Sequence, residues 1–129
     1  MAQVRVLVVD DQSPFRVAAR AVVGATAGFE LVGEASSGEE AVEQAGEVRP
    51  DMVLMDINMD GIGGIEATRR ICTAQPEVKV VLLSTYDVAD LPADAKSCGA
   101  TAYVHKEEFG PEVLERIWTG EDEAPLLCP

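Results

Sequence analysis

The sequence predicts an α/β fold, a doubly wound five-stranded parallel sheet with helices on both faces. Two observations predict it. Five short apolar runs alternate with segments of helical periodicity, and three of the runs are almost continuously aliphatic. Continuous runs of this kind are typical of strands buried on both faces, as in a parallel sheet. Because parallel strands are joined by right-handed crossovers, the intervening helices lie on both faces.

The expected strands are all short. The first, third and fourth are the continuous aliphatic runs, and the second and fifth are more mixed. In chain order the expected strands are Val4–Val9, Glu30–Ala35, Met52–Met55, Val78–Leu83 and Ala102–Val104.

The first two expected helices begin with recognisable start signals. Ser13 is expected to cap the first helix, because Pro14 follows it at the first helical position. Ser37 precedes two glutamates at the start of the second helix. The core-facing residues are expected to be Phe15, Ala18, Ala19, Val22 and Val23 in the first helix, and Ala41, Val42, Ala45 and Val48 in the second.

The third expected helix runs from about Gly64 to Ala74, and the fifth starts near Pro111. Phe109 and Trp118 are assigned to the fifth helix as half-buried packing residues, with a partner surface as the alternative. The core-facing residues are expected to be Ile65, Ala67, Thr68 and Ile71 in the third helix, and Val113, Leu114, Ile117 and Trp118 in the fifth.

The fourth expected helix is bounded by Asp90 and Gly99. Pro92 lies near its start, and proline is tolerated only in the first turn of a helix. We therefore expect this helix to be short or to begin late.

The composition indicates one acidic domain. The chain has 129 residues and a formal net charge of −13. Such a surface repels nucleic-acid phosphates and anionic membranes, so we expect this chain to bind neither directly. No run approaches the ~20 apolar residues that span a bilayer, and no signal-peptide pattern is present, so we expect a cytoplasmic protein.

Residues 1–119 are expected to form the domain and residues 120–129 a C-terminal tail or linker stub. The cysteines lack any C-x-x-C spacing and predict neither a zinc site nor a disulfide.

Polar residues follow four of the five expected strands. Asp10 and Asp11 follow the first, Asp56 the third, Ser84 the fourth, and Lys106 follows the fifth within two residues. In an open α/β sheet, ligands bind beyond the carboxyl ends of the strands. We therefore expect three carboxylates, a hydroxyl and an ammonium group at one edge of the sheet.

The chemistry of this set favours phosphoryl transfer. Clustered carboxylates repel one another unless a cation is present. Mg²⁺ prefers oxygen ligands and is commonly bound by one or two carboxylates together with phosphate oxygens. A carboxylate can act as the nucleophile and form an aspartyl phosphate. A lysine and a hydroxyl can then stabilise the phosphoryl oxygens.

These residues also carry a family resemblance. The runs VLVVDD, DMVLMDINMDGIGG, VVLLST and CGATAYVHK surround them in order between Val4 and about Trp118. The chain resembles the receiver domain of bacterial response regulators in two-component systems. The resemblance implies a flavodoxin-like (βα)5 fold with strand order 2-1-3-4-5. The runs DINMDGIGGIEATRRI and LLSTYD are most similar to the subfamily with a C-terminal LuxR-type helix-turn-helix.

The resemblance implies roles for individual residues. Asp56 would be the phosphoacceptor and would bind Mg²⁺ together with Asp11 and the backbone carbonyl of Asn58. Asp10 would act mainly through a bound water. Lys106 would pair with a phosphoryl oxygen.

The resemblance also implies a switch and its partners. Ser84 would move toward the phosphoryl group, and Tyr103 would be the aromatic residue that changes rotamer with it. A sensor histidine kinase would donate the phosphoryl group while docked mostly beside the first helix. Phosphorylation would reshape the face of the fourth helix, fifth strand and fifth helix. That face would pair with itself as a homodimer, or with an output partner. Transcriptional output would require a domain absent from this chain.

Two departures from the family pattern stand out. Asp60 replaces a proline that is frequent four residues after the phosphoacceptor, and Glu107-Glu108 replaces a proline that often follows the lysine. Asn58 and Tyr86 occupy positions that tune dephosphorylation in the family.

Alternatives remain open at this point. A magnesium-dependent phosphohydrolase of the haloacid-dehalogenase type would need an aspartate where Asn58 stands, so we expect no enzyme beyond slow self-phosphorylation and self-dephosphorylation. A pseudo-receiver scaffold would bind partners without phosphorylation.

Individual residues also have simpler interpretations. Tyr103 could simply pack against the sheet edge. His105 is expected to be a partly exposed strand or loop residue and not a ligand. Gly61–Gly64 is interpreted as a flexible loop and not as a nucleotide site.

Overall fold

The computed structural model describes residues 3–85 and 93–120. Five parallel strands form one sheet in the order β2-β1-β3-β4-β5. This confirms the predicted fold class and strand order. The strands are β1 (Val4–Val9), β2 (Phe29–Ala35), β3 (Met52–Asp56), β4 (Lys79–Ser84) and β5 (Ala102–His105).

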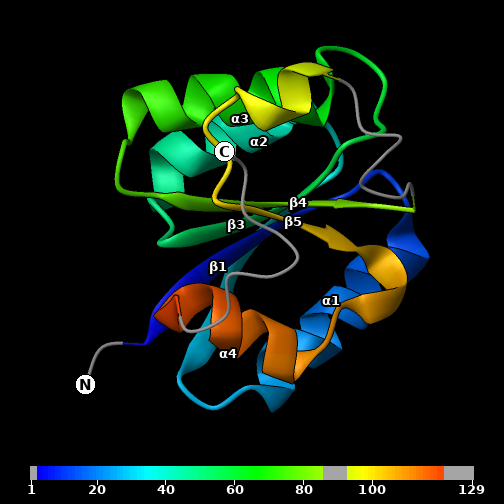
Figure 1. The fold of residues 1–129 in the computed structure, drawn as a ribbon, viewed down its shortest axis with the longest axis vertical. Coiled ribbons are helices and arrows are strands. Elements are labelled where there is room, and N and C mark those ends of the chain that lie inside the picture. The colour runs from blue at the N-terminus through cyan, green and yellow to red at the C-terminus, as the bar shows by residue number, and fades with distance from the viewer. Residues whose placement is uncertain (1–2, 86–92, 121–129) are drawn as a thin grey trace.

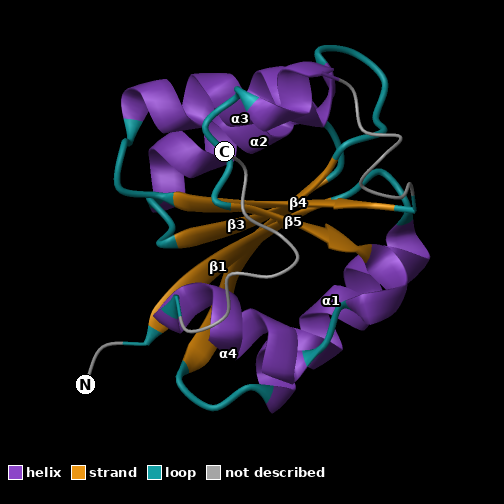
Figure 2. Ribbon diagram, viewed as in Figure 1, coloured by secondary structure: helices purple, strands orange, loops and turns teal. Residues whose placement is uncertain are grey.

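Helices cover both faces of the sheet (Figure 1). Helices α2 and α3 lie on one face, and α1 and α4 lie on the other (Figure 2). Among the described residues, the α-helices are α1 (Ser13–Ala25), α2 (Gly38–Val48), α3 (Gly63–Ala74) and α4 (Pro111–Thr119), and the 3-10 helices are η2 (Ala93–Lys96) and η3 (Lys106–Glu108). Within the same residues, no helix is both long and apolar enough to cross a bilayer.

The core consists of two apolar layers, one on each face of the sheet. Successive side chains of a strand point to opposite faces. In β3, Val53 and Met55 accordingly pack beneath α2 and α3, whereas Met52 and Leu54 pack beneath α1 and α4. All five residues of β3 are buried. The continuous apolar run in the sequence is thus explained by a central strand that is covered on both faces.

The helix starts agree with the sequence in part. Ser37 caps α2 as predicted, and its hydroxyl accepts a hydrogen bond from the backbone N–H of Glu40. The prediction for α1 was wrong by one residue, because Gln12 is the N-cap and Ser13 begins the helix. Ala18, which was expected to face the core, is exposed.

Between β4 and β5, the structure describes Thr85 and residues 93–101. Within the described residues, a single turn of 3-10 helix spans Ala93–Lys96, in agreement with the late or short helix that Pro92 predicts. Pro92 and Tyr86 lie outside the described residues, as does most of the expected tail at 120–129. Phe109 precedes α4 and is not part of it, which corrects its assignment to that helix. Its ring lies 6.1 Å, between centroids, from the ring of Phe15 in α1.

Helix α4 is attached to the sheet near its C-terminal end. Lys79 Nζ donates a hydrogen bond of 2.8 Å to the carbonyl oxygen of Trp118. The same ammonium lies 4.9 Å from the centroid of the Trp118 ring, within the range of a cation–π interaction. Lys79 is the first residue of β4, so this contact lies at the amino edge of the sheet.

Candidate functional site

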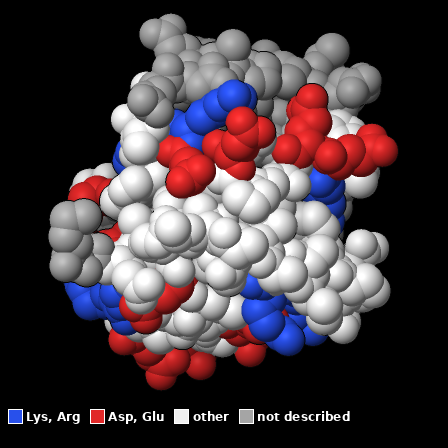
Figure 3. Space-filling model, turned by 90° about the horizontal axis from the view of Figure 1, so that it is seen from below, with Lys and Arg blue, Asp and Glu red and all other residues white. Residues whose placement is uncertain are grey.

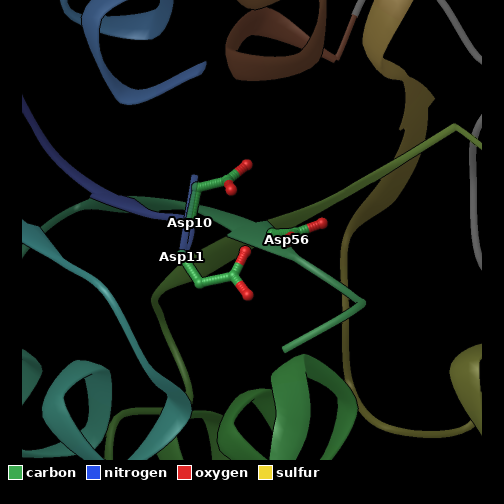
Figure 4. A group of neighbouring side chains, drawn as sticks. All are labelled: Asp10, Asp11 and Asp56. Atoms are coloured by element: carbon green, nitrogen blue, oxygen red, sulfur yellow. The ribbon is translucent and has the colours of Figure 1, made fainter. Parts of the chain in front are cut away.

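Three aspartates meet at the carboxyl edge of the sheet. Asp10 and Asp11 follow β1 directly, and Asp56 is the last residue of β3. Strands β1 and β3 are hydrogen-bonded neighbours, so their carboxyl ends lie together. Each carboxylate contributes an oxygen to a group whose atoms all lie within 4.8 Å of one another. Figure 4 shows Asp10 and Asp11 diverging from the end of β1 beside Asp56.

Asp10 is fully buried and held through its backbone and its side chain. Its N–H donates to the Ala35 carbonyl of β2 at 3.0 Å, and its carbonyl accepts from Arg16 Nη1 at 2.6 Å. Its Oδ1 accepts from the backbone N–H of Gln12 at 2.8 Å. The position of this carboxylate is therefore fixed before any ligand arrives. The contribution of Arg16 was missed by sequence reasoning, because it depends on how α1 packs.

Lys106 brings the positive charge into the cluster. Its Nζ lies 2.8 Å from Asp10 Oδ2 and 3.4 Å from Asp56 Oδ1, and 4.5 Å from the centroid of the Phe15 ring. Burial by itself would lower the pKa of Lys106, but the Asp10 and Asp56 carboxylates outweigh it, and the pKa is raised. The lysine therefore stays charged at neutral pH.

Asp56 is only 3% exposed, and its pKa is raised to about 6. Burial is the largest cause, followed by repulsion from Asp10. Lys106 and the backbone N–H of Asn58 act in the opposite direction and lower this pKa. One cation is thus insufficient to neutralise the cluster.

A pocket of about 320 Å³ opens beside the aspartates. It is lined by Asp11, Asn58, Asp60 and their neighbours Ile57 and Met59. The structure therefore places Asn58 on the wall of a pocket that it shares with Asp11. It also places Asp60, in the position of the frequent proline, on the wall of the same pocket.

Gly64 determines how closely α3 approaches the site. Its N–H donates to the Ile57 carbonyl at 3.2 Å, and a Cβ at position 64 would overlap with the Asp56 carbonyl oxygen. Gly63 and Gly64 are the first two residues of α3, and Gly64 is buried there, so the prediction of a flexible loop over Gly61–Gly64 was wrong for these two residues. A close backbone approach is a common reason for glycine next to a strand end.

The two predicted switch residues are both buried. Ser84 ends β4, is 1% exposed, and is the register partner of His105 in β5. Tyr103 is 3% exposed and packs in the layer beneath α2 and α3. Ser84 thus reaches the same sheet edge as Asp56, whereas Tyr103 belongs to the core of one face.

The donor set fits a hard divalent cation such as Mg²⁺. Three carboxylates supply the oxygen ligands that Mg²⁺ prefers. Among the described residues, the buried Asp10 Oδ2 has the Lys106 ammonium, at 2.8 Å in an ion pair, as its one close polar contact. A cation with its bound waters would satisfy this oxygen and reduce the repulsion that raises the pKa of Asp56.

Comparison with known proteins agrees with this geometry. The family model described as "response regulator receiver domain" matches residues 6–118. The chain belongs to the response regulator receiver domain family. Receiver domains function in phosphorylation-based signalling, bind Mg²⁺ at an acidic pocket, and interact with histidine kinases and output domains. The acidic cluster of Asp10, Asp11 and Asp56 lies within the part of the chain that the family model matches.

Individual relatives agree with this membership. The receiver is 39% identical to the response regulator GacA of Pseudomonas viridiflava and 40% identical to UvrY of Escherichia coli K12, each over 114 residues and 88% of this chain. The matches cover 53% and 52% of those proteins, so this chain spans about half of their length. A LuxR-family two-component response regulator from Aurantimonas has a similar structure, with a TM-score of 0.82 and 30% identity. That match covers 92% of this receiver and 84% of that chain.

Proposed function

We propose that Asp56 accepts a phosphoryl group from the phosphohistidine of a sensor histidine kinase. An Asp56 oxygen attacks phosphorus as the bond to the histidine nitrogen breaks. The observation that carries this proposal is the buried Asp56 carboxylate, with Lys106 Nζ at 3.4 Å and two further carboxylates beside it. Lys106 is charged and close enough to take a phosphoryl oxygen as the new group forms.

Mg²⁺ is the cofactor of this proposal. Asp11 and Asp56 are its direct carboxylate ligands, the Asn58 backbone carbonyl is a further ligand, and Asp10 acts mainly through a bound water. The shared pocket of Asp11 and Asn58 supports this arrangement. The bound ion supplies charge neutralisation for the incoming phosphoryl group. Asp60 on the same wall adds negative charge to the pocket.

The switch residues are Ser84 and Tyr103. Ser84 is proposed to donate its hydroxyl hydrogen to a phosphoryl oxygen, with Tyr103 changing rotamer as Ser84 moves. The surface that responds is formed by η2, β5 and α4, and it pairs with a second copy of this chain or with an output partner. The position of Tyr103 two residues before His105, the register partner of Ser84, supports this coupling.

The kinase is proposed to dock beside α1. Figure 3 shows the side of the molecule that carries α1 and α4, where uncharged side chains fill the centre and charged ones surround it. Val17 of α1 is a large apolar residue that is 53% exposed. Apolar surface at the centre with charges at the rim is the usual composition of a protein interface.

The output is proposed to be transcriptional, through a LuxR-type helix-turn-helix that lies outside residues 1–129. The greater length of the GacA and UvrY relatives supports this. Residues 1–119 then form the receiver and residues 120–129 the linker to the output. A net charge of −13 supports an indirect role in nucleic-acid binding. We place the protein in the cytoplasm, where sensor kinases present their phosphohistidine.

Labelling by acetyl phosphate tests the proposed function. With Mg²⁺, intact-mass spectrometry should show one added phosphoryl group on the wild type and none on Asp56→Asn. Glu47→Gln, which changes an exposed carboxylate of α2, should be labelled like the wild type. Equal labelling of Asp56→Asn and wild type would remove the proposal.

The same experiment measures the fate of the phosphoryl group. We propose slow self-phosphorylation and slow self-dephosphorylation without turnover of external substrates. Multiple turnovers of a generic phosphomonoester would instead indicate a phosphohydrolase. A folded wild-type protein that binds Mg²⁺ but takes no label would indicate a scaffold.

A further inference from the structure

His105 is the sole histidine of the chain and the last residue of β5. Its side chain is partly exposed, as expected from the sequence. Both ring nitrogens nevertheless have partners. Nδ1 lies 3.2 Å from the backbone nitrogen of Glu107, and Nε2 lies 2.9 Å from the carbonyl oxygen of Thr85.

These two contacts define the tautomer of the ring. The backbone N–H of Glu107 can only donate, so Nδ1 must accept and carries no proton. The Thr85 carbonyl can only accept, so Nε2 must carry the proton and donate it. The imidazole is therefore held as the neutral Nε2–H tautomer.

The ring joins two segments that carry functional groups. Thr85 follows Ser84, the proposed phosphoryl-sensing hydroxyl, and Glu107 follows Lys106, the proposed phosphoryl-binding ammonium. The register between β4 and β5 ends at the pair Ser84 and His105. The imidazole therefore extends the connection between the two strands one residue beyond their last backbone pair.

We infer that His105 is a positioning residue that fixes the Ser84–Thr85 end of β4 relative to Lys106. This inference rests on the proposed function, because it concerns the two groups that would contact the phosphoryl oxygens. A hydroxyl and an ammonium that are already in place need less reorganisation as the phosphoryl group arrives. His105 itself contacts neither the phosphoryl group nor the three aspartates.

Two conservative variants separate the two ring contacts. In His105→Gln the amide nitrogen can replace Nε2 and donate to Thr85, while the acceptor for Glu107 is lost. In His105→Asn the amide oxygen can replace Nδ1 and accept from Glu107, while the contact with Thr85 is lost. His105→Gln therefore keeps the connection between β4 and β5, whereas His105→Asn keeps only the local cap of η3.

The rate of Asp56 labelling by acetyl phosphate is the first measurement. His105→Asn should be slower than wild type by roughly three- to tenfold, the effect of one net hydrogen bond. His105→Gln should remain close to wild type. The reverse order, or equal rates in all three proteins, would overturn the inference.

Nuclear magnetic resonance supplies a second measurement that does not depend on phosphorylation. Nitrogen-15 shifts of His105 should report the Nε2–H tautomer that the Glu107 and Thr85 contacts define. The amide signals of Ser84 and Lys106 should move in His105→Asn and stay in place in His105→Gln. An Nδ1–H tautomer, or unmoved amides in both variants, would overturn the inference.

The two measurements distinguish this inference from the proposed function. A wild type that takes no label would count against the proposed function, and the Ser84 and Lys106 amide signals would then decide the role of His105. Mg²⁺ affinity should be the same in wild type and His105→Gln, because that variant keeps the contact with Thr85. An altered affinity in His105→Gln would mean that the substitution itself disturbs the acidic cluster, which would also overturn the inference.

Discussion

Lys106 Nζ lies closer to Asp10 than to Asp56, at 2.8 Å against 3.4 Å. The lysine is therefore anchored by the aspartate that is fully buried, and it faces Asp56, the proposed phosphoacceptor, as its second partner. This arrangement would let Lys106 exchange its Asp56 contact for a phosphoryl oxygen while Asp10 keeps it in place.

Removing Lys106 should destabilise the protein strongly. Lys106→Met leaves the buried Asp10 carboxylate without its counter-charge, and breaking a buried pair on one side costs about 3–5 kcal/mol. Urea unfolding at pH 7 without Mg²⁺ measures this loss. The double variant Lys106→Met/Asp10→Asn should regain much of the stability, because the charge that was left unpaired is then gone. A double variant no more stable than Lys106→Met would contradict the anchoring role.

The stability of the magnesium-free protein should fall as the pH rises from about 4 to about 6. Asp56 has a pKa of about 6 in the folded protein against 3.8 ordinarily, so in this window the folded state retains a proton that the unfolded state has lost. The free energy of unfolding therefore decreases with pH, by on the order of 1–3 kcal/mol. Asp56→Asn should lack this decrease and be the more stable protein at pH 7. Parallel slopes for the two proteins in urea unfolding from pH 3.5 to 7 would contradict the raised pKa.

Mg²⁺ should stabilise the wild type, because it binds the folded state and offsets the repulsion between Asp10, Asp11 and Asp56. A ligand present at 100 times its Kd raises the free energy of unfolding by about 2.7 kcal/mol. Asp11→Asn should lose most of this effect. Glu47→Gln in α2 should keep it. Thermal unfolding with and without MgCl₂ measures the difference, and an equal Mg²⁺ response in both variants would place the ion elsewhere.

Gly64→Ala should destabilise the protein and weaken phosphorylation together. The added Cβ would overlap with the Asp56 carbonyl oxygen, so the end of β3 or the start of α3 must move. Overpacking of this kind costs roughly 1–3 kcal/mol. Gly46→Ala is the matched control, because nothing lies within 4 Å of a Cβ there. It should stabilise α2 by about 0.5–1 kcal/mol and leave labelling of Asp56 unchanged. Unchanged labelling in Gly64→Ala would show that the close approach does not position the phosphoacceptor.

The sheet and the acidic cluster could be predicted from the sequence because both depend on local pattern. A central strand that is buried on both faces must be apolar throughout, as β3 is, and the topology then places Asp56 beside Asp10 and Asp11. Other roles, such as that of the Asn58 carbonyl, could not be inferred from the pattern of charged residues and came only from the resemblance to receiver domains.

The features that could not be predicted depend on how elements pack. Ser13 has the right chemistry for a cap, yet the backbone of Gln12 occupies that position. The contact of Arg16 with the Asp10 carbonyl depends on how α1 packs, and the contact of His105 with the Thr85 carbonyl joins residues that are 20 positions apart along the chain. The buried position of Gly64 follows from the short distance between α3 and β3, and this distance cannot be inferred from the sequence alone.

Because Trp118 is attached to Lys79, α4 is held to the sheet at this end, and a shift at its other end changes the direction of the helix. Its C-terminal end is held at the amino edge of β4, about 17 Å along that strand from the carboxyl edge, at roughly 3.3 Å for each residue. Its N-terminal end begins after Gly110, shortly beyond η3, which starts at Lys106. A displacement of η3 would therefore rotate α4 about Trp118, with the largest displacement at Pro111. Phosphorylation would reach the rest of the molecule as a change in helix direction.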